Sequence, residues 1–132
     1  MDKVVKSEAE WRAQLTGEEY RVCREAGTET PFSGAYVSDK TAGIYACACC
    51  GELLFDAATK YDSGTGWPSF FQPLAADKVD TAPDDSLGRS RTEVTCSRCD
   101  AHLGHVFDDG PRPTGLRYCM NSVALKLDPA AQ

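Results

Sequence analysis

Two C-x-x-C pairs constrain the fold of this chain more than any other feature. The first pair is Cys47 and Cys50, the second is Cys96 and Cys99, and 45 residues separate them. A two-residue gap lets a tight turn aim two sulfurs at one ion, and two such turns supply the four thiolates that structural zinc prefers. Closing so long a loop costs little more than closing a shorter one. We therefore predict one structural Zn²⁺ that joins distant parts of the chain.

Two alternatives concern the same cysteines. Cys49 lies inside the first pair and could replace a neighbour as ligand, although only Cys47 and Cys50 have the two-residue gap. One pair could instead be redox-active, with the other serving as ordinary buried cysteine. In a reducing compartment two pairs favour a metal, and a closed four-coordinate site acts in folding rather than in catalysis.

The bulk properties exclude several classes of protein. The chain has 132 residues and is 42% apolar, so we expect a single domain spanning 1–132. The net charge of −6 disfavours nucleic acid as a partner. No apolar run approaches the roughly 18 to 20 residues of a membrane span, and the charged start 1–6 does not resemble a signal peptide. We expect no membrane association and a cytoplasmic (cytosolic) protein, where the seven cysteines stay reduced.

The local patterns predict helices first and strands afterwards. Ser7 and Thr16 each stand three residues before a Glu, which predicts capped helices at 8–15 and 17–26, with Gly27 as a stop. Beyond Thr30, aromatic and β-branched runs alternate with turn residues, as in antiparallel strands. The predicted strands are 43–47, 68–73, 90–95, 103–108 and 115–126, and 75–90 reads as a solvated loop.

Removing four metal ligands from seven cysteines leaves Cys23, Cys49 and Cys119, and Cys119 has the most reactive surroundings. Side chains alternate along a strand, so Arg117, Cys119 and Asn121 share one face. The guanidinium of Arg117 would favour a reactive thiolate, and the amide of Asn121 could donate to a bound group.

Two further segments suggest a site around this thiol. The hexapeptide H-L-G-H-V-F begins three residues after Cys99 and holds both histidines of the chain, His102 and His105. Histidine is the usual general acid or base beside a nucleophilic thiol. The segment around Trp67 presents aromatic surface, which makes favourable contacts with sulfur and methyl groups. Purely structural roles for the histidines and a core position for the aromatic segment remain the alternatives.

Three motifs together carry a family resemblance. They are G-T-G-W-P-S-F at 64–70, H-L-G-H-V-F at 102–107 and R-Y-C-M-N-S at 117–122. In this order, and with both C-x-x-C pairs, the chain resembles the zinc-binding form of peptide methionine-R-sulfoxide reductase, the type B methionine sulfoxide reductase, from about residue 11 to 127. The resemblance implies a mainly β fold of two antiparallel sheets, tent-like or sandwich-like, with short N-terminal helices and a four-cysteine zinc site.

The resemblance also implies residue roles. Cys119 would attack the sulfur of methionine sulfoxide, and His105 would protonate the departing oxygen. Asn121 and His102 would orient or stabilise the site. Trp67 would stack on the substrate methyl group beside Phe107, and Arg117 would support the charge pattern around the thiol.

The product of the attack, a sulfenic acid on Cys119, condenses readily with a second thiol. Many members of the family carry that thiol where this chain has Thr65, which cannot form a disulfide. The resemblance therefore points to Cys23, with a Cys23–Cys119 disulfide that thioredoxin reduces by exchange. Cys49 is the second candidate, and direct reduction of the sulfenic acid is the alternative to both.

Two other functions compete with this interpretation. A non-catalytic zinc module would keep the four ligands but would not need Cys119, His105 and Asn121 together. A general disulfide oxidoreductase would use one C-x-x-C pair, and it would be excluded by about one zinc per chain with those four thiols protected.

Overall fold

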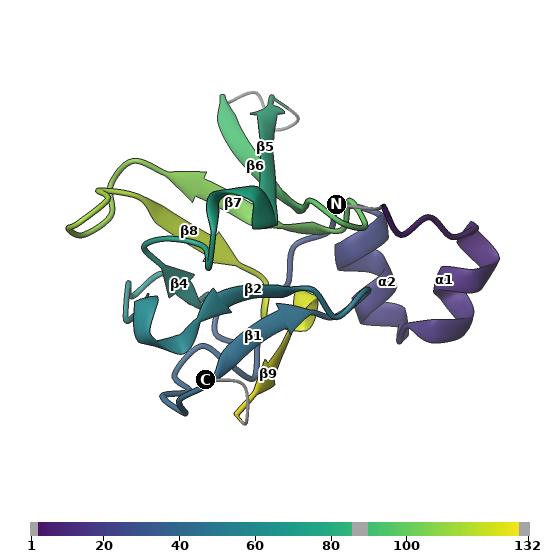
Figure 1. Ribbon diagram of the computed structural model, residues 1–132, viewed down its shortest axis with the longest axis horizontal. Coiled ribbons are helices and arrows are strands. Elements are labelled where there is room, and N and C mark those ends of the chain that lie inside the picture. The colour runs from purple at the N-terminus through teal and green to yellow at the C-terminus, as the bar shows by residue number, and fades with distance from the viewer. Residues whose placement is uncertain (1–2, 86–89, 130–132) are drawn as a thin grey trace.

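The computed structural model describes residues 3–85 and 90–129, and it begins with two short helices (Figure 1). Helix α1 spans Glu8–Gln14 and helix α2 spans Gly17–Arg24. Ser7 and Thr16 each form a complete capping box, so both predicted helix starts are confirmed. Among the described residues, no helix is long and apolar enough to cross a membrane.

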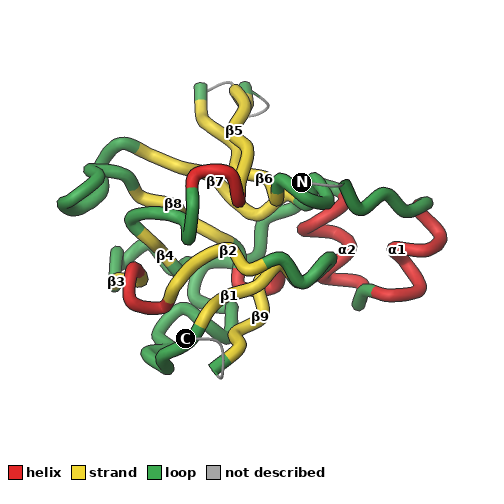
Figure 2. The backbone as a smooth tube through the Cα atoms, viewed as in Figure 1, coloured by secondary structure: helices red, strands yellow, loops and turns green. Residues whose placement is uncertain are grey.

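Within the part of the chain that the structure describes, the strands form two antiparallel sheets (Figure 2), which confirms the predicted fold class. The smaller sheet has the order β2-β1-β9, and the larger has the order β3-β4-β8-β7-β6-β5. The smaller sheet contains β1 (Ile44–Cys47), β2 (Leu53–Asp56) and β9 (Leu125–Asp128). The larger sheet contains β3 (Lys60–Tyr61), β4 (Ser69–Phe70), β5 (Val79–Asp84), β6 (Arg91–Cys96), β7 (His102–Phe107) and β8 (Arg117–Met120). Three short 3₁₀ helices are η1 (Ala57–Thr59), η2 (Ala76–Lys78) and η3 (Ser122–Ala124).

One strand prediction and one loop prediction are wrong, and β2 and β3 were not expected from the sequence. The expected single strand 115–126 is two strands, β8 and β9, which lie in different sheets and are joined by η3. The expected loop 75–90 contains η2 and all of β5, while 86–89 lies outside the described residues. β5 is the edge strand of the larger sheet, and only Val79 in it is buried, so the strand lacks the alternation that a half-buried strand shows.

An aromatic cluster between the two sheets forms the centre of the core. Tyr45 of β1 and Phe55 of β2 both pack on Phe70 of β4, with ring centroids 5.3 and 4.5 Å apart. All three side chains are fully buried, and burial of each contributes on the order of 2–3 kcal/mol. The cluster therefore fixes the smaller sheet against the strand that neighbours β8.

Residues 28–36, here called the strap, cross from α2 toward β1 over the end of β8. Glu29 is its anchor: its backbone N–H donates to Asn121 Oδ1 at 2.9 Å, and its carboxylate accepts from the N–H of Val123 at 3.0 Å. The backbone carbonyl of Glu29 accepts from Trp67 Nε1 at 3.1 Å. The strap thereby ties together the motif that contains Trp67 and the segment that follows β8.

Candidate metal centre and active site

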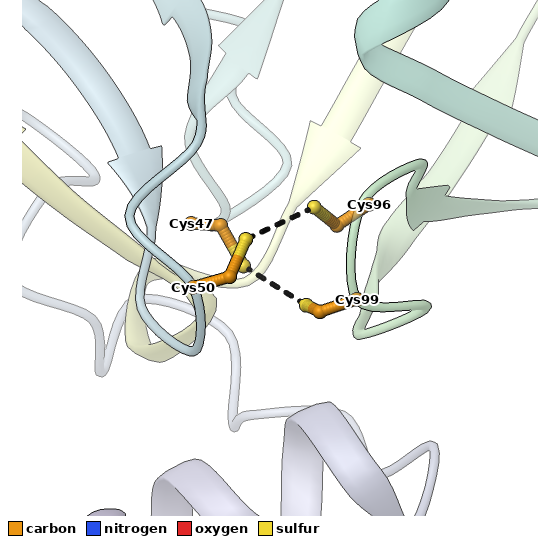
Figure 3. Close-up of side chains that lie close together, drawn as sticks. All are labelled: Cys47, Cys50, Cys96 and Cys99. Carbon is orange, nitrogen blue, oxygen red and sulfur yellow. Dashed lines mark hydrogen bonds between the residues drawn. The ribbon is translucent and has the colours of Figure 1, made fainter. Parts of the chain in front are cut away.

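The four predicted metal ligands come together where the two sheets meet. Cys47 ends β1, Cys96 ends β6, and each turn carries its second cysteine back toward the other pair (Figure 3). All four Sγ atoms lie within 4.8 Å of one another, with Cys47–Cys99 and Cys50–Cys96 each at 3.6 Å. Tetrahedral coordination with Zn–S bonds of about 2.3 Å would put the sulfurs about 3.8 Å apart. The cluster is therefore able to hold a metal ion of that size.

The two helices pack against these turns. Arg24 of α2 donates to the carbonyl of Cys99 at 2.8 Å, and Gln14 of α1 donates to the carbonyl of Cys49 at 2.6 Å. The neighbouring sulfurs shift the thiol pKa values in opposite directions, lowering that of Cys50 to about 7 and raising those of Cys47 and Cys99, so it is the geometry of the cluster that supports a metal site. The N-terminal helices thus brace the metal centre rather than stand apart from it.

A second site opens on the larger sheet as a pocket of about 280 Å³. The pocket brings together six predicted site residues from three separate motifs, which supports their assignment to one site. The pocket is lined by Thr28, Thr65, Trp67, Arg91, Gly104, His105, Phe107, Arg117, Cys119 and Asn121.

Cys119 lies in the middle of the sheet, directly opposite His105 of β7 and Ser69 of β4. Side chains opposite one another on neighbouring strands have Cβ atoms about 4.5–5.5 Å apart. The hydroxyl of Thr65 is 3.8 Å from Cys119 Sγ. The predicted thiol and imidazole therefore face the same space.

Cys119 was expected to be a thiolate beside Arg117, but its surroundings favour the protonated thiol. Burial raises the pKa of its thiol above the ordinary value, and the opposing effects of Thr65 and Arg117 are smaller. Arg117 donates two hydrogen bonds to Asp109, at 2.8 and 3.1 Å, so that carboxylate offsets part of its positive charge. The thiol is consequently protonated near neutral pH, and Arg117 alone does not make it a thiolate.

Each histidine contacts a carboxylate on a neighbouring strand or hairpin. His105 Nε2 lies 2.7 Å from Asp84 Oδ2, and His102 Nδ1 lies 2.7 Å from Glu93 Oε2. The rings are 5.4 Å apart. Burial lowers the pKa of His105, which leaves its imidazole neutral near pH 7. With Nε2–H donated to Asp84, Nδ1 of His105 carries a lone pair.

Asn121 and Trp67 have partners within the protein. Asn121 Nδ2 donates to the carbonyl of Leu103 at 3.0 Å, while its Oδ1 accepts from the strap. One amide hydrogen of Asn121 is thus used in a hydrogen bond within the protein. Trp67 is oriented by its bond to Glu29, and the guanidinium of Arg117 lies 4.3 Å from the ring of Phe107.

Known proteins are similar to this chain over most of its length. A family model described as SelR domain matches residues 15–129. The chain belongs to the SelR family. A relative from Hahella chejuensis, named peptide methionine sulfoxide reductase MsrB, is 59% identical over 98% of this chain and 94% of its own length. Relatives of the same name from Pseudomonas aeruginosa and Pseudomonas putida are 60% and 59% identical, each over 98% of both chains. The resemblance predicted from the motifs is confirmed.

Two predicted residues of this SelR chain are not among those that line the described pocket. Cys23 lies on α2 with 2% of its surface exposed, and α2 packs against β7 and η3. His102 lies behind His105 with its Nε2 buried and without a partner among the described residues. Its role at the pocket would pass through the neighbouring imidazole.

Six polar residues were missed from the sequence: Thr28, Thr65 and Arg91 line the pocket, and Asp84, Glu93 and Asp109 contact site residues. Thr65 belongs to the G-T-G-W motif, so its proximity to the thiol could have been inferred from the motif itself. Asp84, Glu93 and Asp109 contact site residues only because of strand register and loop closure. Neither motif nor spacing in the SelR sequence marks them.

Proposed function

We propose that this chain reduces the R epimer of methionine sulfoxide in proteins and peptides to methionine, as one catalytic domain spanning residues 1–132. One observation carries the proposal: Cys119 and His105 are cross-strand neighbours that open into a single pocket, together with Trp67 and Phe107. A thiol and an acid must approach one sulfoxide group together, and this register brings them there.

The first step is a proton transfer. A neutral His105 accepts the proton of Cys119 at Nδ1, and the carboxylate of Asp84 stabilises the imidazolium that forms. The resulting thiolate attacks the sulfoxide sulfur while the imidazolium protonates the oxygen. A raised thiol pKa and a lowered imidazole pKa suit this order, because both groups start uncharged in the buried pocket.

The pocket walls position the substrate for that attack. Trp67 contacts the methyl group, Phe107 completes the apolar wall, and Asn121 holds the strap against the end of β8. His102 keeps the ring of His105 in place through their edge contact. The S–S bond formed in the attack and the S–O bond of the substrate then break as the hydroxyl group passes to Cys119 Sγ, which gives methionine and a sulfenic acid on Cys119.

Recycling uses a second thiol. Cys23 attacks the sulfenic acid, a Cys23–Cys119 disulfide forms, and water leaves; thioredoxin then reduces the disulfide. A disulfide needs Cα atoms within about 7 Å, and Cys23 is buried on α2. Because Cys23 is not among the residues that line the pocket around Cys119, we expect the N-terminal segment to move in each cycle. A thioredoxin-dependent cycle of this kind fits an enzyme of the cytoplasm.

The metal centre supplies folding energy. Cys47, Cys50, Cys96 and Cys99 would hold one Zn²⁺, which is closed to substrate because all four positions are thiolates. His102 begins β7 three residues after Cys99. The ion would thereby fix the start of the strand that presents His105.

The reaction itself is tested with a blocked methionine sulfoxide, as separated epimers. Wild type should consume the R epimer only, and Cys119→Ser should consume neither. A Cys119→Ser protein as active as wild type would refute the mechanism.

The recycling thiol is tested with a rescue. Cys23→Ser should lose thioredoxin-supported turnover while still releasing about one methionine per chain in a single turnover. Adding Thr65→Cys to that variant should restore turnover, because residue 65 already lies beside Cys119. Unchanged turnover in Cys23→Ser would show that Cys23 is not the resolving thiol; mass spectrometry for a Cys49–Cys119 link then tests Cys49.

A further inference from the structure

An exposed aromatic ring lies at the rim of the pocket and has no part in the reaction above. Phe32 of the strap leaves 70% of its surface exposed. Its backbone N–H donates to the carbonyl of Gly66 at 2.7 Å, and Gly66 stands between two residues that line the pocket, Thr65 and Trp67. A Cβ on Gly66 would come within 2.9 and 3.0 Å of two carbons of the Phe32 ring. The ring therefore lies against Gly66, within the segment whose neighbouring residues line the pocket, while Phe32 itself stands outside the lining.

The backbone at this ring is unfavourable for its side chain. The N–H of Ser33 donates to the carbonyl of Thr30, which closes a turn with Pro31 second and Phe32 third. Phe32 has a φ of 65°, in the left-handed region where such a turn favours glycine. A bulky residue in this conformation is strained, and strain of this kind gathers at ligand-binding sites. Because so little of the ring is buried, core packing does not explain it.

We propose that Phe32 is a platform for the polypeptide that flanks the oxidised methionine, and that it binds an apolar side chain within one or two residues of it. This inference rests on the proposed function and adds a preference among substrates. The sulfoxide group itself occupies the pocket beside Cys119, so only the chain that continues from it can reach the rim.

The chemistry of the rim favours an apolar neighbour over a charged one. Thr30, Pro31 and Ser33, which surround the ring in the turn, carry no charge. An aromatic face gains most from contact with another apolar or aromatic side chain, and exposed aromatic rings at a rim often dominate recognition. Free methionine sulfoxide would make no such contact.

The test compares substrates in Phe32→Gly, a change that the positive φ accommodates without strain. Three R-sulfoxide substrates are used: a blocked single residue, a peptide with leucine beside the sulfoxide, and the same peptide with aspartate there. In Phe32→Gly, kcat/KM for the leucine peptide relative to the blocked residue should fall about five- to tenfold, mainly through KM. The aspartate peptide should show little change in this ratio.

Two further variants serve as controls. Phe32→Tyr keeps the ring and should keep the wild-type preference. Leu74→Ala removes another exposed apolar side chain, which lines a different cavity, and should not alter the ratio. A ratio unchanged in Phe32→Gly, or an equal fall for both peptides, would overturn the platform.

Binding gives a readout that does not depend on turnover. In the Cys119→Ser background, the Kd of the labelled leucine peptide, measured by fluorescence anisotropy, should rise by a similar factor on Phe32→Gly. If wild type reduced none of the three sulfoxides, the proposed function would fail, and this binding measurement would still decide the role of Phe32.

Discussion

At the scale of single residues, the site works through the balance of burial against nearby charge. Burial raises the pKa of Cys119 and lowers that of His105, and in each case it is the largest cause. Both groups are therefore neutral at rest, and the charged pair forms only when the proton moves between them. Arg117 and Asp84 limit the free energy of forming that pair.

The positive charge of Arg117 should affect how the alkylation of Cys119 depends on pH. Only the thiolate reacts with iodoacetamide, so labelling of Cys119 should rise with pH around a midpoint above that of an ordinary cysteine. Arg117→Met removes a cation that favours the thiolate, and its midpoint should lie at still higher pH. Mass spectrometry of the Cys119 peptide gives both curves, with the exposed Arg112→Met as control. A shift to lower pH would contradict the assignment.

The carboxylate at Asp84 makes an opposite prediction for His105. Its hydrogen bond raises the pKa of the imidazole, so Asp84→Asn should lower that pKa further. Activity needs neutral His105 and is lost as pH falls through its pKa; the acidic limb of kcat/KM should therefore move to lower pH. The maximal rate should fall by less than the roughly hundredfold or more expected for His105→Ala. Asp80→Asn, an exposed change on the same strand, should leave the limb in place.

At the scale of elements, β7 and β8 must approach closely for the two side chains to meet. Gly104 makes this possible: a Cβ there would lie 2.1 Å from the carbonyl oxygen of Cys119 and 2.9 Å from Cα of Met120. Both obstacles are backbone atoms, which no rotamer change can move. The glycine of the H-L-G-H motif thus sets the distance between the strands that carry the acid and the nucleophile.

Gly104→Ala should therefore displace β8 and destabilise the fold by roughly 1–3 kcal/mol. Urea unfolding measures the change in the free energy of unfolding. Gly17→Ala is the matched control, since a Cβ at that helix start meets nothing within 4 Å, and it should be neutral or slightly stabilising. Equal unfolding midpoints for Gly104→Ala and wild type would refute the close-contact argument.

The helices were predictable from the sequence, because Ser7 and Thr16 carry a local signal that needs no tertiary contact. The four-cysteine cluster was also predictable, since each C-x-x-C spacing aims two sulfurs at one point. The break between β8 and β9 was not, because the apolar residues on either side of η3 read as one run, and the change of sheet depends on contacts with the strap.

The carboxylates that contact the two histidines, Asp84 and Glu93, were equally unpredictable from the sequence. Asp84 ends a strand whose residues are mostly exposed, so its run of polar residues reads as a loop. It meets His105 because β5, β6 and β7 pair in a specific register, which long-range hydrogen bonds decide. The motifs thus identify the side chains that share the pocket, whereas the carboxylates that contact the histidines could be found only from the fold.

At the scale of the whole molecule, the candidate metal centre and the aromatic cluster both join the two sheets. Removing the metal should therefore weaken the connection between the two sheets. Cys50→Ser should lose the bound zinc and lower the stability on the order of 5 kcal/mol, as measured by metal content and thermal unfolding. Cys49→Ser is the control and should keep about one zinc per chain. Loss of zinc from Cys49→Ser with retention in Cys50→Ser would reverse the ligand assignment.

The passage of one segment, 117–128, through both sheets limits how the gene can vary. A single-residue insertion after Cys119 would turn every later side chain of β9 to the opposite face of its sheet. It would also shift the backbone that receives the strap at Val123. The hairpin between β7 and β8 projects from the sheet (Figure 1), but Asp109 within it pairs with Arg117, so insertions should be tolerated only near its tip. The same insertion placed between Arg117 and Asp128 should abolish folding, because two sheets depend on that spacing.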